Sequence, residues 1–365
     1  MKICFLAAAN SIHSHRWVKF FADRGHEIRW ISFAPSTFGA IAGVDYTELP
    51  APGLNALSLI LRVRSIVARS KPDVLHAHYA GMYGMVGAAA GFRPFVVTAW
   101  GSDVIYGSKS LVKRPLLRWT LRRAALVTCD AQHMKERMIR LGIDEAKIKI
   151  IRFGIDTDVF SPRDRAGARR LLGVADRPTV ISTRNLAPVY DVETLVRAVP
   201  LVLARMPETQ FLIAGEGKQK DPLSALAAKL GVSESVRFIG FIPNEKLPEY
   251  LSAADAYVST SLSDGGIAAS TAEAMATGLP VVVTDSGENR SWIEDGRQGF
   301  MAPVRSPEVL ADKIHRLLAD EAAGRRMGIL GRDVIRERND YRIEMGRMEA
   351  LYLEIIGSGT GRAPG

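Results

Sequence analysis

Short apolar runs alternate with longer segments of helical periodicity along most of this chain. The alternation predicts parallel strands whose connecting helices cover both faces of a sheet. In the first half we expect helices over segments such as His15–Arg24 and Leu57–Ser70. The strands expected there are Ile3–Ala8, Ile28–Ala34, Val74–Tyr79, Phe95–Gly101, Leu126–Asp130 and Ile148–Gly154.

The alternation is interrupted after Phe160 and begins again at Thr179. The strands expected in the second half are Thr179–Thr183, Gln210–Gly215, Val236–Phe241, Ala256–Ser261 and Pro280–Asp285. Because 365 residues exceed one ordinary domain core, we predict two doubly wound, Rossmann-like α/β domains that face each other across a deep cleft. They span residues 1–165 and 166–340, and a helix over 341–356 and a flexible tail over 357–365 follow them.

The composition excludes several classes of protein. Hydrophobic residues make up 47% and charged residues 24%, and no apolar run approaches the ~20 residues of a membrane-spanning helix. The first residues, 1–7, fit a buried strand better than a signal peptide. Cys4 and Cys129 lie in apolar runs, and we interpret them as two buried thiols rather than a disulfide. The sequence therefore predicts a cytoplasmic protein.

Positive charge is concentrated in the first half of the chain. Residues 1–165 contain 24 Lys and Arg against 13 Asp and Glu, whereas residues 166–365 contain 24 against 26. The densest part is Lys109–Arg123, a predicted basic helix with apolar residues interleaved. One interpretation is a solvated helix face; the other is a docking surface for anionic lipid at the inner membrane face or for an acidic acceptor. We expect no nucleic-acid partner, because no recognition motif accompanies the charge.

The segment Ser259–Asp285 carries the strongest indication of a binding site. A strand is followed by a turn containing Asp264, Gly265 and Gly266, and then by a helix of small residues. Backbone N–H groups at the start of such a helix suit a phosphate or a sugar hydroxyl. Glu273 lies in that helix among Ala and Met, where a carboxylate needs a partner, and a ribose diol would supply two donors. The alternative is a glutamate on an exposed helix face.

Other candidate residues follow predicted strands. Arg184 comes at the end of one strand, where a guanidinium suits a diphosphate, although a surface arginine is the alternative. Gly215 and Gly217 follow another strand and allow a ligand to approach the backbone closely. Asp103 follows a strand of the first half, the place expected for a carboxylate that binds substrate or accepts a proton; the alternative is that it caps the following turn.

The first half also contains several histidines. His76 and His78 alternate along one predicted strand, and we expect one to be half-buried and the other to lie at the cleft, because no third metal ligand is nearby. Asn10 and Ser11 form a small polar loop without the G-x-G-x-x-G pattern, which disfavours a dinucleotide redox cofactor. We expect neither metal nor cofactor, so that the chemistry depends on positioning and charge stabilisation. The residues expected on the acceptor side are His13, His15, His78 and Trp100.

Together these residues resemble the retaining glycosyltransferases of family four, which have the GT-B architecture. The resemblance extends over most of the chain and rests on the order and spacing of its motifs. These are Arg24–Glu27, His76–His78, Gly101–Asp103, Gly154–Pro162, Phe211–Gly217, Val236–Gly240, Tyr250–Asp255, Glu273–Thr284 and Ile293–Gly299.

The resemblance implies a metal-independent, front-face transfer of a sugar from a UDP- or GDP-sugar to a glycan, lipid-linked or small-molecule acceptor. It implies that Glu273 holds the donor ribose, that Arg184 neutralises the diphosphate, and that Asp103 helps to position a substrate. The final helix is expected to pack back on the first domain. The implied donor-binding residues are Asn10, Ser11, Arg184, Asn185, Gly215, Gly240, Phe241, Ile242, Asp264, Gly265, Gly266, Ile267 and Glu273.

Two positions depart from the family pattern. The family commonly has a second glutamate eight residues before the one matching Glu273; here that position is Gly265, preceded by Asp264. The family also has a lysine five or six residues after its phosphate-binding arginine, where this chain has Val189 and Tyr190. We therefore expect the diphosphate and sugar end of the donor site to be unusual.

Two other functions are compatible with these departures. One is a sugar-nucleotide epimerase of the same fold, with Asp103 and Asp264 as its acid and base groups. The other is a donor-binding protein with impaired catalysis. The retention of Glu273, Arg184 and the glycine-rich loops favours an active transferase.

Overall fold

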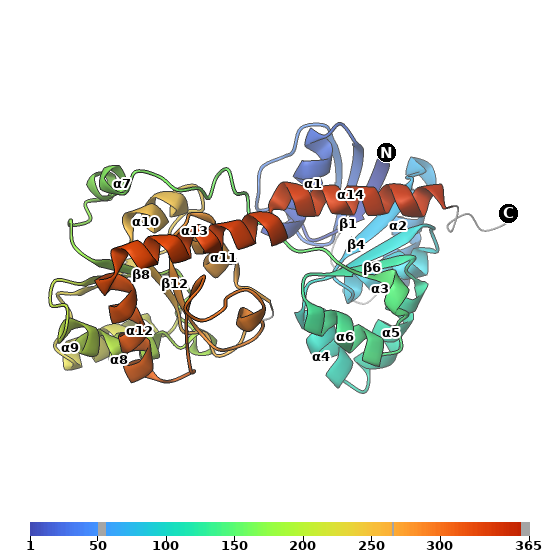
Figure 1. Cartoon of the computed structure of the whole chain (residues 1–365). Coiled ribbons are helices and arrows are strands. Elements are labelled where there is room, and N and C mark those ends of the chain that lie inside the picture. The colour runs from blue at the N-terminus through green and yellow to red at the C-terminus, as the bar shows by residue number, and fades with distance from the viewer. Residues whose placement is uncertain (50–55, 265, 359–365) are drawn as a thin grey trace. The chain divides into compact units, whose positions relative to one another are not determined.

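The computed structural model describes residues 1–49, 56–264 and 266–358, and these form two compact units (Figure 1). Unit 1 comprises Met1–Gly154 and the segment that begins at Arg342, and unit 2 comprises Ile155–Tyr341. Each unit contains one parallel sheet with helices on both faces. The predicted α/β class, with two doubly wound units, is confirmed.

The sheet of unit 1 has seven strands in the order β3-β2-β1-β4-β5-β6-β7. The strands are β1 Lys2–Leu6, β2 Glu27–Ser32, β3 Val44–Glu48, β4 Val74–His78, β5 Phe95–Ala99, β6 Leu126–Cys129 and β7 Ile148–Ile150. The helices are α1 Ile12–Asp23, α2 Ala56–Ser70, α3 Met82–Ala90, α4 Ser102–Lys109, α5 Lys113–Arg123, α6 Gln132–Arg140 and α14 Tyr341–Gly357. Strands β2 and β3 follow β1 on one side of it, and the chain then returns to place β4 on the other side. The carboxyl ends of β1 and β4 therefore form a topological switch point.

Alternate residues of the central strands enter two separate cores. On one face, residues such as Leu6 and Leu75 pack with apolar residues of α2, α3, α5 and α6. On the other face, Phe5 contacts Phe21 of α1, whose ring lies 5.3 Å from that of Tyr352 in α14. Since both faces are covered, the central strands are buried throughout, as is typical of parallel sheets. Cys4 and Cys129 are buried free thiols in this sheet, as predicted.

The sheet of unit 2 has six strands in the order β10-β9-β8-β11-β12-β13, with a switch point between β8 and β11. The strands are β8 Thr179–Ser182, β9 Gln210–Ala214, β10 Val236–Gly240, β11 Ala256–Ser259, β12 Val281–Thr284 and β13 Gly299–Ala302. The helices are α7 Arg165–Leu172, α8 Val192–Leu203, α9 Lys220–Lys229, α10 Leu247–Ala253, α11 Ala269–Ala276, α12 Pro307–Ala319 and α13 Glu321–Arg338.

Two strands were not predicted, and both lie at sheet edges. Every residue of strand β3 is exposed or only partly buried, and most of them are polar. The strand therefore lacks the apolar run that marks a central strand. Strand β13 has only four residues and begins with Gly299. Most predicted strands also extended one or two residues too far into the loop that follows them.

The boundary between the units differs from the prediction. Residues 155–165 belong to unit 2. Ile155 N–H donates to Asn339 O (2.7 Å) and Ile155 O accepts the Tyr341 N–H (2.9 Å), where α13 ends and α14 begins. The final helix was predicted over 341–356 and occupies Tyr341–Gly357. It packs on unit 1, where Glu344 accepts the Arg152 N–H (2.8 Å) and Glu349 contacts His26 (2.6 Å). Of the predicted tail, residues 359–365 lie outside the described residues.

Candidate functional site

The loops after β8 and β11 meet at the switch point of unit 2. The N–H of Leu262 donates to Val189 O (2.9 Å), and the hydroxyl of Thr260 donates to Tyr190 O (3.0 Å). In open α/β sheets a ligand binds beside such a point, outside the carboxyl ends of the strands. The candidate site is therefore built on these two loops.

Arg184 lies in the first of these loops, two residues after β8. One of its terminal nitrogens donates to Asp264 Oδ1 (2.5 Å) and the other to Ser270 Oγ (3.0 Å). The side chains of Arg184 and Asp264 are only 10% and 9% exposed, so this is a buried ion pair. Ser270 is fixed in turn by a hydrogen bond from the Tyr257 hydroxyl (2.8 Å).

Tyr190 occupies one of the two positions, with Val189, at which the sequence resemblance led us to expect a lysine. Its ring centroid lies 4.3 Å from the guanidinium carbon of Arg184, a cation–π distance. The site therefore has an aromatic face beneath one cation instead of a second cation.

The ion pair leaves two polar atoms without partners. Arg184 Nε and Asp264 Oδ2 are both buried, and neither has a hydrogen-bond partner within the described residues. A buried polar atom without a partner costs free energy. A ligand that carries both acceptors and donors would satisfy both atoms.

Two glycines allow the neighbouring loops to approach this site closely. Gly215, after β9, has φ +110°, and a Cβ there would lie 2.4 Å from Arg184 O. Gly287, after β12, has φ +57°, and a Cβ there would lie 2.2 Å from Asp264 O. A larger residue at either position would displace the backbone that carries one member of the ion pair.

Glu273 lies in α11, as predicted, on the fifth residue of that helix. It is half-buried, and its neighbours Ala272 and Ala274 are fully buried. The alternative of a fully exposed helix face is therefore wrong. Ser270, which binds Arg184, lies three residues earlier on the same helix, so α11 contributes to both parts of the candidate site.

The other predicted donor residues of unit 2 are arranged around the same sheet edge. Gly215 N donates to Gly240 O (2.8 Å), which joins the loops after β9 and β10. Asn185 and Phe241 are exposed, whereas Ile242 and Ile267 are buried. Gly266 is half-buried. Gly265 lies outside the described residues.

At the switch point of unit 1, the structure brings together some of the predicted residues. Ser11 caps α1 by accepting the Ser14 N–H, and Asn10 beside it is exposed. The rings of His13 and Trp100 are stacked with centroids 5.0 Å apart. Burial lowers the pKa of His13, which favours the neutral imidazole. His15 instead lies against Phe38, with ring centroids 5.1 Å apart.

The prediction for His76 and His78 is wrong, because both side chains are buried. His76 hydrogen-bonds with the hydroxyls of Tyr352 and Thr98, and His78 Nδ1 lies 3.3 Å from Ser14 Oγ. Burial lowers the pKa of His76, and it lowers that of His78 to about 3. His78 is thus a buried, neutral imidazole, and its Nε2 has no hydrogen-bond partner within the described residues.

Asp103 is a buried structural carboxylate. Its two oxygens accept the N–H groups of Ala80 (2.6 Å), Val104 (3.0 Å) and Gly101 (3.1 Å). Burial raises the pKa of Asp103, and these backbone donors oppose that effect. Of these donors only Val104 N–H belongs to the turn that follows Asp103, so the side chain also joins that turn to the two loops before it. Its contact with a substrate stays a prediction.

Comparison with known proteins identifies the family. Residues 168–334 match the glycosyl transferases group 1, and residues 2–131 match the glycosyl transferase 4-like family. The chain is 30% identical over 278 residues to the GDP-mannose-dependent alpha-(1-6)-phosphatidylinositol monomannoside mannosyltransferase of Mycolicibacterium smegmatis, across 74% of this chain and 72% of that protein. The chain is a group 1 glycosyltransferase of family four. The D-inositol 3-phosphate glycosyltransferase of Kribbella flavida is 26% identical over 319 residues, across 80% of this chain and 73% of that protein.

The glycosyltransferase also shares its fold with solved structures. HepE of Anabaena, in complex with UDP, superposes with a TM-score of 0.83 across 97% of this chain and 100% of that chain, at 22% identity. This similarity shows the GT-B fold that the sequence predicted.

Sequence reasoning missed part of the cluster around Arg184 in this glycosyltransferase. It named Arg184 and Asp264 separately but did not pair them, and it did not identify Ser270 or Tyr257. Tyr190 was noted only as a departure from the family pattern. The tyrosine at this position was the one feature of the sequence that could have predicted the cluster, because an aromatic ring in place of a lysine can stack on the neighbouring arginine.

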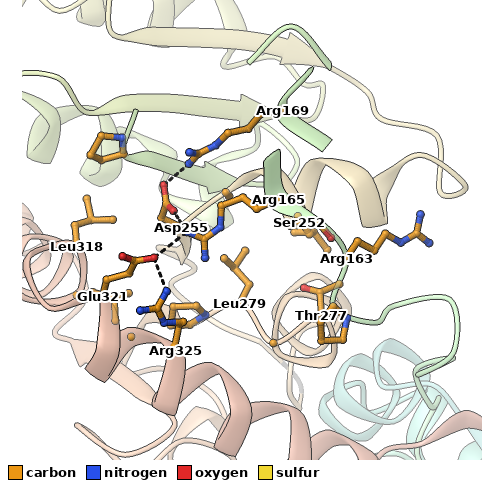
Figure 2. A pocket seen from close by; sticks show the side chains of 18 of the residues that line it. Arg163, Arg165, Arg169, Ser252, Asp255, Thr277, Leu279, Leu318, Glu321 and Arg325 are labelled. Atoms are coloured by element: carbon orange, nitrogen blue, oxygen red, sulfur yellow. Dashed lines mark hydrogen bonds and ion pairs between the residues drawn. The ribbon is translucent and has the colours of Figure 1, made fainter. Parts of the chain in front are cut away.

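A hollow in unit 2 lies at the amino ends of the strands, away from the switch-point loops. It encloses about 470 Å³ (Figure 2). Asp255 accepts hydrogen bonds from Arg165 and Arg169 (both 2.6 Å), and Glu321 lies 2.8 Å from Arg325 and 3.5 Å from Arg165. The charges of these guanidiniums are thus balanced by neighbouring carboxylates.

Two further features are absent from the described residues. No three His, Cys, Asp or Glu side chains there are placed to share a metal ion. No helix in the same residues combines the length and apolar character needed to span a bilayer.

Proposed function

We propose that this glycosyltransferase moves a hexosyl group, with retention of anomeric configuration, from a UDP- or GDP-sugar to a glycan, lipid-linked or small-molecule acceptor. The observation that carries the proposal is the buried guanidinium of Arg184 at the switch point of unit 2. The similar mannosyltransferase is named as GDP-mannose-dependent, and HepE was solved with UDP. Both support a nucleoside diphosphate as the leaving group.

The proposed reaction needs stabilisation of the charge that develops on the departing diphosphate. The acceptor hydroxyl oxygen bonds to the anomeric carbon while the bond from that carbon to the diphosphate oxygen breaks. The hydroxyl proton passes to the departing diphosphate. Arg184 would offer its guanidinium to that group, and the low exposure of the site strengthens the interaction. The scheme requires neither a metal nor a covalent enzyme intermediate.

The acceptor would be held by unit 1. The stacked rings of His13 and Trp100 offer an apolar platform for a sugar ring, and exposed Asn10 offers an amide for its hydroxyls. We also propose that the enzyme works at an anionic membrane surface through Lys109–Arg123, where a lipid-linked acceptor would be found.

A panel of nucleotide sugars tests the proposal. UDP-, GDP-, ADP- and CMP-sugars are compared by thermal shift, and products are then analysed with the most stabilising donor. We expect a UDP- or GDP-sugar to raise the melting temperature and to yield a glycoside with the donor's anomeric configuration. Lack of stabilisation by any nucleotide sugar would contradict the proposal, and an isomerised free donor would instead indicate an epimerase.

We expect Glu273→Gln to weaken donor binding by about 10- to 100-fold, because a charge-assisted hydrogen bond contributes about 1.5–3 kcal/mol. Titration calorimetry with the best nucleotide sugar measures the effect. The matched control is Glu234→Gln, which changes an exposed glutamate of the same unit and should leave affinity unchanged. Equal affinities for all three proteins would place the ribose elsewhere.

Tyr190→Ala is expected to lower donor affinity by about 2- to 30-fold, because the Arg184 guanidinium loses an aromatic face worth roughly 0.5–2 kcal/mol. Tyr190→Phe keeps that face and should retain wild-type affinity. The two variants are compared by competition with the nucleoside diphosphate. If the phenylalanine variant is as impaired as the alanine variant, the phenolic hydroxyl and not the ring is important.

A further inference from the structure

Helix α5 and the turn before it form an unusually basic surface on unit 1. Between Asp103 and Asp130 the sequence contains six Lys and Arg and no Asp or Glu. All six of these cations are exposed: Lys109, Lys113, Arg114, Arg118, Arg122 and Arg123. Within the described part of the chain, none of these six forms an ion pair with a carboxylate. Their mutual repulsion is therefore relieved only by solvent ions or by an anionic partner.

Part of this surface is hollowed. A depression there has a volume of about 430 Å³. Its lining consists of Arg93, Pro115, Trp119 and four arginines of α5, and it includes no carboxylate. Two of these guanidiniums donate to backbone carbonyls: Arg93 to Arg123 O (3.2 Å), and Arg122 through Nε to Gly142 O (3.4 Å). We call this depression the arginine hollow; the arginines that line it are Arg93, Arg114, Arg118, Arg122 and Arg123.

Trp119 adds an aromatic wall to the arginine hollow. The guanidinium of Arg123 lies 4.9 Å from its ring centroid, which presents that cation on a flat apolar support. Guanidinium groups bind phosphate oxygens in a bidentate manner, and tryptophan is enriched at the interface between water and lipid. The chemistry of the hollow thus matches a phosphate carried by a lipid.

An apolar pair lies in the turn that leads into α5. Leu111 and Val112 are 88% and 87% exposed, in the turn between α4 and α5. Transfer of large, exposed apolar side chains from water into an apolar phase is favourable, because it removes their surface from water. Cations beside exposed apolar residues are typical of segments that lie in the headgroup region of a bilayer.

We propose that the arginine hollow binds the phosphate of an anionic phospholipid headgroup while Leu111 and Val112 enter the outer part of the acyl region. This inference extends the membrane surface of the proposed function to a defined site and a defined partner. It uses residues of unit 1 that take no part in donor binding, so the two proposals can fail separately. The occupant is a lipid rather than a soluble phosphate because the apolar pair accompanies the cations.

Co-sedimentation of the full chain with vesicles tests this site. Phosphatidylcholine vesicles are compared with vesicles that also contain phosphatidylglycerol, and only the latter are expected to bind. Arg114→Gln/Arg118→Gln/Arg122→Gln should lower vesicle affinity by roughly 100-fold, since each cation at an anionic surface contributes about fivefold. Leu111→Ser/Val112→Ser should lower it by roughly tenfold or more.

The matched control removes the same charge from unit 2. Lys229→Gln/Arg326→Gln/Arg336→Gln changes three exposed cations and should bind anionic vesicles as the wild type does. Thermal shift with the nucleotide sugar should give the wild-type response in every variant, which separates membrane docking from donor binding. Equal binding to neutral vesicles, or full binding by the α5 variant, would overturn the proposal. So would complete competition by inorganic diphosphate with no effect of the Leu111/Val112 change, which would indicate a soluble phosphate ligand.

Discussion

Arg184→Ala is expected to weaken binding of the nucleotide sugar by about 10- to 100-fold, because the diphosphate loses a charge-assisted partner worth about 1.5–3 kcal/mol. The same change leaves the Asp264 carboxylate buried without its cation. Breaking a buried ion pair from one side costs about 3–5 kcal/mol of stability. Calorimetric titration with the donor and urea unfolding measure the two effects on one protein.

A double variant separates the two consequences. Arg184→Ala/Asp264→Asn removes both charges of the pair, so it should recover much of the lost stability while donor binding stays weak. Recovery of donor binding in the double variant would mean that Arg184 acts only by neutralising Asp264. Arg197→Ala is the control, because Arg197 forms an exposed pair with Glu193 and should change stability by at most about 0.5 kcal/mol.

Tyr352→Ala is expected to destabilise the protein by about 3–5 kcal/mol, the range for removal of a large buried aromatic side chain. Tyr352 is fully buried between α14 and the sheet of unit 1, where its ring contacts Phe21 and its hydroxyl bonds with His76. The change would leave a cavity and an unpaired imidazole nitrogen. Urea unfolding, followed by circular dichroism, measures the loss.

Two companion variants divide this effect into its parts. Tyr352→Phe keeps the ring and removes the hydroxyl, so it should cost only about 1–3 kcal/mol. Leu353→Ala changes the next residue of the same helix, which is exposed, and should cost at most about 0.5 kcal/mol. A loss as large for Leu353→Ala as for Tyr352→Ala would mean that the helix is sensitive as a whole, and that the buried contact is not the cause.

The extent to which the fold was predictable depended on where each strand lies. Central strands such as β4 and β5 are buried on both faces, so they are continuous apolar runs that the sequence displays directly. Edge strand β3 is half solvated and carries Asp45 and Glu48, so its sequence resembles that of a loop. The same two-sided burial explains the error at His78: alternation along a strand does not expose one side when helices cover both faces.

The candidate site was predictable only in part, because its contacts join residues that are distant in the sequence. Local patterns indicated Arg184, at a strand end, and Glu273, in a helix of small residues. The pairing of Arg184 with Asp264 bridges 80 residues and follows from the strand order β8-β11, which no local pattern contains. The buried hydrogen bonds of Asp103 likewise depend on how the loops after β4 and β5 meet.

The packing of α14 on unit 1 also affects the order in which the protein can fold during synthesis. Residues 155–341 form a continuous unit whose contacts are complete once that segment has emerged from the ribosome. Unit 1 begins first, yet its sheet waits for Met345, Met348 and Tyr352, which are translated only after the whole of unit 2 and are fully buried in the finished fold. Until then the apolar surface that α14 covers remains open to water. We therefore expect the first unit made to be the last one completed, and a nascent chain halted before residue 341 to depend on chaperones.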